Sequence, residues 1–173
     1  NEDQISDEFD FCPMSGEELG WLGYFIGKST NLQHLCISST PSSSCDAGIE
    51  DFRMGLGRNK SIRKISFCNH LDVHIFPMLD IFFKNIDNNL SELEVSYCEL
   101  DVEGIRQLSL ALGLCKNKPL KQISLTQNQI GDRQLVDIIL SLIMHPQLEY
   151  LDFSGMNLGR NECTALSTLL RNT

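Results

Sequence analysis

Histidines and cysteines are the residues of this chain whose types and spacing best suit metal binding or nucleophilic catalysis. His70 and His74 are four residues apart, a spacing that places two imidazoles on one face of a helix, as in many metal sites. Only Asp72 and Asp80 are near enough to complete a ligand set, and the expected junction between strand and helix falls in this stretch. We therefore predict ordinary turn and helix residues here and no metal site.

The cysteines are odd in number, widely spaced and without a C-x-x-C pair: Cys12, Cys36, Cys45, Cys68, Cys98, Cys115 and Cys163. This spacing argues against a zinc site and against a disulfide framework, and favours buried, reduced thiols in the cytoplasm or the nucleus. Cys36 and Cys68 project from adjacent predicted strands, but two residues out of register and without a neighbouring base. We predict no catalytic cysteine.

Two other kinds of segment resemble sites of chemistry. Thr126-Gln127-Asn128-Gln129, within LKQISLTQNQIG, has the composition of a polar active-site loop, and GYFIGK (23–28) and GLGRNK (55–60) are glycine-rich like phosphate loops. The glycines, however, lie in predicted helices that precede a strand, whereas a phosphate loop follows a strand and opens a helix. They are better suited to ending helices or to tight packing. We predict no enzyme, no catalytic residues and no cofactor.

The polar run 126–129 belongs to a repeat. Five segments have apolar residues at their first, fourth and sixth positions, and they lie near residues 32–40, 62–70, 90–98, 120–128 and 148–156. Their starts are separated by steps of 30, 28, 30 and 28 residues. The alternation within each segment predicts a half-buried strand.

Helices are predicted between these strands. In 132–144, Leu135, Ile138, Ile139 and Leu142 recur at helical spacing, and similar patterns precede and follow the other segments. A strand, a helix and a second strand in so short a unit must form a right-handed parallel crossover. The sequence therefore predicts an α/β fold with a parallel sheet.

The pattern L-x-x-L-x-L-x-x-N/C-x-L resembles the leucine-rich repeat, and the long alternating period resembles its ribonuclease-inhibitor-like subclass. The resemblance covers about residues 15–173 and implies a curved solenoid with a concave parallel sheet, convex helices, about five strands and six helices. It also implies that the ninth position carries a small polar side chain that satisfies backbone groups of the turn. Thr40, Cys98 and Asn128 fit that role, whereas His70 and Met156 depart from it.

Charge and hydropathy exclude some function classes. The chain has 173 residues, 42% of them hydrophobic, which is enough for one domain, and it has no apolar run long enough to span a membrane. Seven of its 23 acidic residues lie in residues 1–18, whereas all 14 Lys and Arg residues lie in the rest of the chain, which therefore has a net charge of only −2. We predict an acidic, flexible N-terminal arm over residues 1–14, and no nucleic-acid or membrane partner.

The outward-facing side chains of the sheet are the remaining candidates for function. Third, fifth and eighth positions of the last three segments carry tyrosines beside carboxylates and amides, a mixture common in protein interfaces. The predicted partner-binding residues on the concave face are Glu92, Glu94, Tyr97, Gln122, Gln127, Tyr150 and Asp152. We expect a non-catalytic module that binds a protein or peptide there.

Relatives with similar repeats suggest alternatives by analogy alone. These are the regulatory repeat region of a NOD-like receptor, a GTPase-activating protein similar to that for Ran, and a purely structural spacer. Residues 17–31 resemble the helical half of a repeat whose strand is missing or altered, and Asn172-Thr173 resemble residues just before a strand. We therefore expect further repeats or a capping domain at the C-terminal end.

Overall fold

The computed structural model describes residues 8–12, 15–38, 46–68, 84, 89–98, 100–114, 120–128, 130 and 132–172. Within them, six strands form one parallel sheet whose spatial order follows the chain. The strands are β1 (Glu8–Phe11), β2 (His34–Ile37), β3 (Lys64–Cys68), β4 (Glu92–Ser96), β5 (Gln122–Ser124) and β6 (Tyr150–Asp152).

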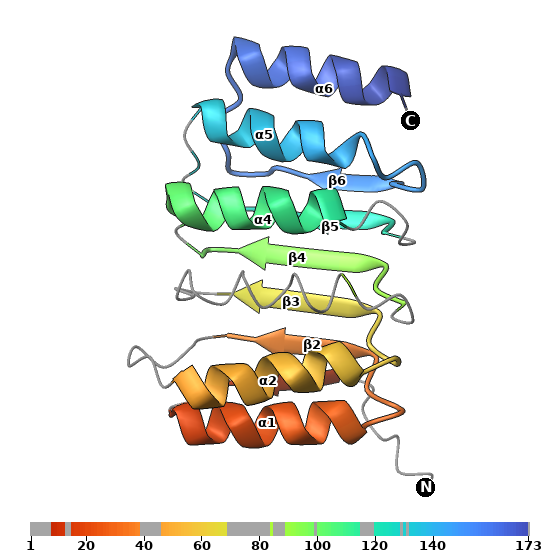
Figure 1. The fold of residues 1–173 in the computed structure, drawn as a ribbon. Helices are drawn as coiled ribbons and strands as arrows, with labels where there is room; N and C mark the ends of the chain where they lie inside the picture. Colours follow the sequence, from red (N-terminus) through yellow and green to blue (C-terminus); the bar gives the residue numbers. More distant parts are fainter. Residues whose placement is uncertain are drawn as a thin grey trace, which may run out of the picture.

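Helices cover one face of this sheet and stack in the same order as the strands (Figure 1). Those in the described residues are α1 (Gly16–Lys28), α2 (Asp46–Arg58), α4 (Val102–Leu114), α5 (Asp132–Leu142) and α6 (Arg160–Asn172). The predicted α/β fold with a parallel sheet is therefore confirmed, whereas most of the stretch between β3 and β4 lies outside the described residues. No described helix is both long enough and apolar enough to cross a lipid bilayer.

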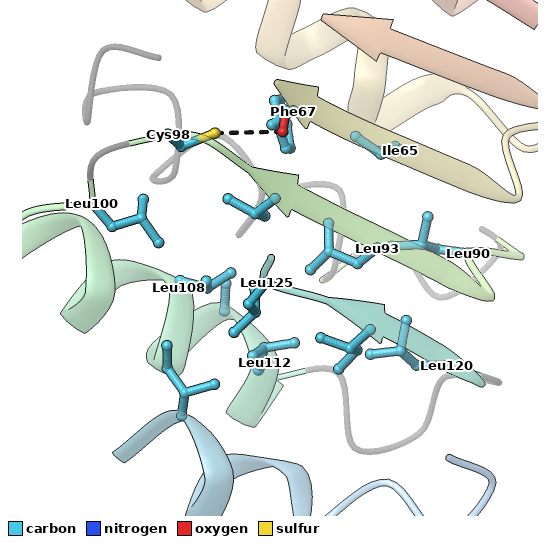
Figure 2. Close-up of a cluster of buried hydrophobic side chains, with 14 of the residues drawn as sticks. Ile65, Phe67, Leu90, Leu93, Cys98, Leu100, Leu108, Leu112, Leu120 and Leu125 are labelled. Carbon is cyan, nitrogen blue, oxygen red and sulfur yellow. Dashed lines mark hydrogen bonds between the residues drawn. The ribbon is translucent and has the colours of Figure 1, made fainter. Parts of the chain in front are cut away.

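The register of the sheet reproduces the register of the sequence repeat. Third positions of successive segments are direct strand partners, from His34 opposite Lys64 to Gln122 opposite Tyr150. Fourth and sixth positions point toward the helices and form the core, as the cluster around Leu93 and Leu125 illustrates (Figure 2). Leu148, Leu151 and Phe153, at the first, fourth and sixth positions of the last segment, are only partly buried. The same three positions of the three middle segments are at most 1% exposed, and they are Ile62, Ile65, Phe67, Leu90, Leu93, Val95, Leu120, Ile123 and Leu125.

Strand β1 lies in the segment that the sequence assigned to a flexible arm. Its residues pair with β2, from Glu8 opposite His34 to Phe11 opposite Ile37, so the sheet has six strands rather than about five. The alternation of two phenylalanines with two acids is a strand pattern, and Phe11 packs against the core. The acids that dominate residues 1–18 conceal this pattern in the composition. This strand is also the one that precedes the helical half-repeat predicted at residues 17–31.

Helices α1 and α2 lie in direct backbone contact. A Cβ atom added at Gly48 would lie 1.8 Å from the carbonyl oxygen of Gly16, and one at Gly55 would lie 1.9 Å from that of Gly23. The prediction of tight packing for the glycines of 23–28 is thus confirmed, because Gly27 also approaches Gly55. Glycine is required at these contacts because any side chain would force the helices apart.

Candidate functional site

The sheet face turned away from the helices carries two rows of side chains in register. The third-position row consists of His34, Lys64, Glu92, Gln122 and Tyr150, and the fifth-position row of Cys36, Ser66, Glu94, Ser124 and Asp152. Neighbouring strands of a sheet are about 4.8 Å apart, so successive members of a row are within reach of one another. Polar groups distant in sequence therefore meet on this face.

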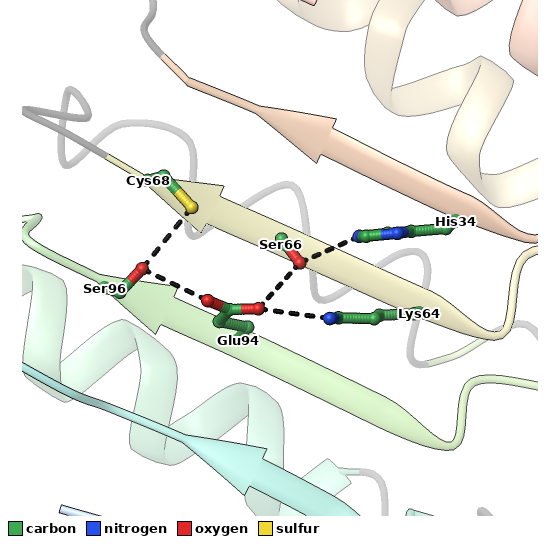
Figure 3. Close-up of polar contacts among 6 residues, drawn as sticks. All are labelled: His34, Lys64, Ser66, Cys68, Glu94 and Ser96. Carbon is green, nitrogen blue, oxygen red and sulfur yellow. Dashed lines mark hydrogen bonds and ion pairs between the residues drawn. The ribbon is translucent and has the colours of Figure 1, made fainter. Parts of the chain in front are cut away.

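Glu94 is the centre of a polar network on β2, β3 and β4 (Figure 3). Its Oε2 accepts a hydrogen bond from Ser66 Oγ at 3.1 Å and lies 3.3 Å from Lys64 Nζ. Its Oε1 accepts from Ser96 Oγ at 3.4 Å. The His34 Nε2 lies 3.0 Å from Ser66 Oγ. These contacts hold the Glu94 carboxylate in one orientation.

The order of groups in this network differs from that of a catalytic triad. In a triad the histidine accepts the proton of the serine, and the acid holds the other side of the imidazole. Here Ser66 donates its proton to Glu94, so Ser66 Oγ is the acceptor for an Nε2–H of His34. Ser66 is also only 2% exposed. Its hydroxyl is therefore a bridge between two side chains and not an activated nucleophile.

A shallow hollow of about 190 Å³ adjoins Glu94 on β4, β5 and β6. Five of the seven predicted partner-binding residues line it, together with Lys64 and Ser124: Glu92, Glu94, Gln122, Tyr150 and Asp152. Ser124 is the small side chain between Glu94 and Asp152 in the fifth-position row, and its size leaves room for the hollow.

Asp152 and Tyr150 form one side of the hollow. Asp152 Oδ1 accepts hydrogen bonds from Ser154 Oγ at 2.6 Å and Ser154 N at 2.8 Å, and these bonds lower the pKa of its carboxyl group. Tyr150 donates its hydroxyl to Asp152 Oδ2 at 3.2 Å, and the carboxylate's charge raises the pKa of this tyrosine. At neutral pH this side of the hollow thus presents the Asp152 carboxylate beside the protonated phenol of Tyr150.

Tyr97 and Gln127, the other two predicted residues, lie beyond the strands and do not line the hollow. Both adopt positive φ angles, 55° and 56°, and the equivalent Gly155 has a φ of 75°. The Gln127 side chain lies over Gly155, since a Cβ added there would be 2.3 Å from its Nε2. The alternation of side chains ends where the backbone enters this left-handed conformation, which the apolar pattern does not reveal.

Asn128 and Cys98 have the structural role that the repeat pattern implied. The buried Asn128 side chain accepts from Cys98 N at 2.9 Å and donates to the carbonyl oxygen of Val95 at 2.7 Å. The Cys98 thiol donates to the carbonyl of Phe67 at 3.4 Å (Figure 2). The polar run 126–129 therefore contains a residue that stabilises a turn, Asn128. Met156 is partly buried against the core, and Thr40 and His70 lie outside the described residues.

A second set of buried polar ties was missed by sequence reasoning. Asn59 donates to the carbonyl of Ile26 at 2.7 Å and accepts from the backbone N–H of Ile62 at 2.8 Å. His145 Nε2 lies 2.9 Å from the carbonyl of Leu112, and burial lowers the pKa of this histidine. Both residues stand three positions before the start of a strand segment. Comparison of that position across the repeats would have revealed them.

Cys36 and Cys68 approach one another on the open sheet face. Burial and the neighbouring Cys68 and Asp10 raise the pKa of the Cys36 thiol to about 12. The thiolate, not the thiol, is the nucleophile, so this shift disfavours Cys36 as a nucleophile at neutral pH. No cluster of three or more potential metal ligands occurs among the described residues, and His70 and His74 are not among them.

No model of a known protein family matches the chain. A search of curated proteins found no match either.

Proposed function

We propose that the chain is a leucine-rich-repeat protein of the ribonuclease-inhibitor-like subclass and that its sheet forms the concave side of a solenoid. The support is the five segments at steps of 28 or 30 residues, each matching a strand in register with the next. Small-angle X-ray scattering of the purified chain tests the shape. A curved, elongated profile is expected, and a closed, near-spherical one would contradict the solenoid.

The function that these residues support best is non-catalytic binding of a protein or peptide on the open sheet face. The observation that carries this proposal is the hollow beside Glu94, because five residues from three strands converge on it. Tyrosine is a common anchor of protein interfaces, since it buries a large area with few rotatable bonds. Tyr150 is 52% exposed at the rim of the hollow and is available for such a contact.

Charge favours a basic partner. Lys64 offsets Glu94, whereas no described residue forms an ion pair with Glu92 or Asp152. The half-buried Glu92 and Asp152 thus lie on the strands that flank Gln122 without an ion pair to a described residue, although Lys64 is the strand partner of Glu92. A lysine or arginine of the partner, placed over Ser124, would lie between them and complement their charge.

Photo-crosslinking identifies the partner. A photoreactive phenylalanine analogue at position 150 is expected to crosslink one protein that the same analogue at Leu140, on the helix side, does not. The affinity of the purified partner is then measured for the triple variant Glu92→Ala, Tyr150→Ala, Asp152→Ala. We expect at least a tenfold loss with unchanged circular dichroism.

The matched control is the double variant Asp137→Ala, Leu140→Ala, which changes exposed residues of α5. Its affinity should equal that of the wild type. If the triple variant binds as tightly as the control, the hollow is not the binding site. A partner that crosslinks equally from both positions contradicts binding on the sheet face.

A further inference from the structure

An apolar hollow lies open at the end of the sheet where β1 and α1 meet. Strand β1 is the outermost described strand, and α1 is the helix at the same end of the stack (Figure 1). The hollow has a volume of about 470 Å³, and its apolar lining comes from both elements: Phe11, Trp21, Leu22, Phe25 and Ile26. Trp21 and Phe25 are 58% and 62% exposed. Large aromatic side chains exposed around an apolar hollow mark a contact site.

The outer edge of β1 presents hydrogen-bonding groups to a further strand. The carbonyl of Phe11 accepts from Ser38 N at 3.3 Å, so the backbone groups of the odd-numbered residues of β1 face β2. Because successive residues of a strand alternate between its two neighbours, the N–H and C=O groups of Glu8 and Asp10 face the outer edge. No described strand pairs with that edge. An edge of this kind is a template for an extended chain.

The hollow lies where side chains of such a strand would enter the core. Fourth and sixth positions of the strand segments face the helices, and Phe11 is level with Ile37, a sixth position. The α1 side of the hollow runs from Glu18 to Ser29, which is about 16 Å of helix at 1.5 Å per residue. About five residues of extended chain have the same length. Strands β3 and β4 are five residues long, so a strand of that size fills the hollow.

Charge selects the kind of strand that can bind there. Both residues of β1 whose backbone faces the edge, Glu8 and Asp10, are acidic, and so is Glu18 in the lining of the hollow. Antiparallel pairing of β1 with the β1 of a second copy places acids opposite acids, and like charges opposite one another destabilise a strand pair. Basic residues opposite Glu8 and Asp10 stabilise it instead. The edge therefore disfavours a second copy and favours a basic strand.

We propose that the outer edge of β1 and the adjoining hollow bind an extended peptide in which basic and apolar residues alternate. The peptide backbone adds to the sheet beside β1. Its basic side chains lie on the open sheet face opposite Glu8 and Asp10, and its apolar side chains enter the hollow beside Phe11 and Phe25. This site is at the opposite end of the sheet from the hollow on β4, β5 and β6, so it binds independently of a partner there.

The probe is a synthetic hexapeptide in which lysine and valine alternate. Fluorescence anisotropy of the labelled peptide should show binding about tenfold tighter than that of three lysines followed by three valines, a peptide of equal charge and composition. Trp21 is the only tryptophan of the chain and lines the hollow, so unlabelled peptide should shift its emission to shorter wavelength. Only alternate residues of a strand donate to one neighbour. N-methylation of either the valines or the lysines should therefore abolish binding, and N-methylation of the other set should not.

Variants of β1 and α1 locate the bound peptide. Asp10→Lys should weaken binding of the lysine peptide about tenfold and should favour a peptide with glutamate in place of lysine. Asp137→Lys, at an exposed acid of α5, makes the same change of net charge and should do neither. Phe25→Ala should also weaken the lysine peptide about tenfold. Its matched control is Tyr24→Ala, because Tyr24 is adjacent and 56% exposed but does not line the hollow.

Four results would overturn the proposal. They are equal affinity for the alternating and block peptides, equal effects of the two N-methylated sets, equal losses for Phe25→Ala and Tyr24→Ala, and a dimer of the chain whose formation excludes the peptide. The triple variant Glu92→Ala, Tyr150→Ala, Asp152→Ala should bind the peptide as tightly as the wild type. A loss in that variant would place the peptide on the other sheet site, so the failure of this proposal is distinguishable from the failure of the proposed function.

Discussion

The N-terminal and C-terminal helices solve the same packing problem with different chemistry. Helices α1 and α2 touch through glycine backbones, whereas α5 and α6 contain no glycine and bury side chains such as Leu142 and Leu169. The buried tie beside the helices differs as well. The neutral amide of Asn59 donates a hydrogen bond to the carbonyl of Ile26 in α1, and the imidazole of His145 donates one to the carbonyl of Leu112 in α4.

The position three residues before a strand segment is occupied by Asn59 in one repeat and by His145 in another, and the two residues make the protein sensitive to different changes. Asn59 uses both its donor and its acceptor atoms and does not titrate, so its contribution to stability should not depend on pH. The glycine contacts between α1 and α2 make the same end of the molecule sensitive to larger side chains. His145 uses Nε2 as a donor, whereas its buried Nδ1 has no hydrogen-bond partner. The stability of the C-terminal end should therefore respond to pH.

The largest effect is expected from Gly55→Val. Its side chain would overlap the carbonyl of Gly23, and separating the two helices should cost about 3 kcal/mol or more of the free energy of unfolding. Gly113→Ala in α4 is the control, since a Cβ there meets nothing within 4 Å. That change should stabilise the chain by up to about 1 kcal/mol. Urea unfolding measures both, and equal effects would remove the contrast between the helix pairs.

Asn59→Ala should have the next largest effect. It removes the acceptor of the Ile62 N–H and one of the two donors to the carbonyl of Ile26, which keeps its bond from Ser29 N, at a cost of about 1–3 kcal/mol. Asn157→Ala changes an exposed asparagine and should cost less than about 0.5 kcal/mol. Thermal unfolding compares the two. A small loss at Asn59 would show that water replaces the amide.

The smallest effect is the pH dependence from His145. Burial lowers the pKa of the folded imidazole, while the unfolded one titrates near 6.5. The unfolded state therefore binds a proton first, and stability is complete above this pH and is lost as the pH falls below it, by up to about 1.4 kcal/mol per pH unit. The stability of wild type minus His145→Asn should decline from pH 8 to pH 5. A constant difference would contradict the assignment.

The repeat made most of the fold predictable, because an apolar spacing of 1, 4 and 6 fixes both the buried face and the pairing of each strand. It also predicted Asn128, whose position marks the turn. Strand β1 was missed because its two phenylalanines lie among acids. Tyr97 and Gln127 were placed with the sheet face because alternation alone does not show where a backbone turns left-handed. The contact of Gly23 with Gly55 depends on two helices meeting, which no local pattern encodes.

The in-register rows of the sheet also affect how such a chain changes by duplication. Because each unit of 28 or 30 residues contributes one side chain to each row, gaining a whole unit lengthens every row by one place and preserves all other neighbours. Recombination between units can thus insert a new residue between Glu92 and Gln122 without moving either relative to its own helix. The surface can diversify in length and in composition through separate genetic events.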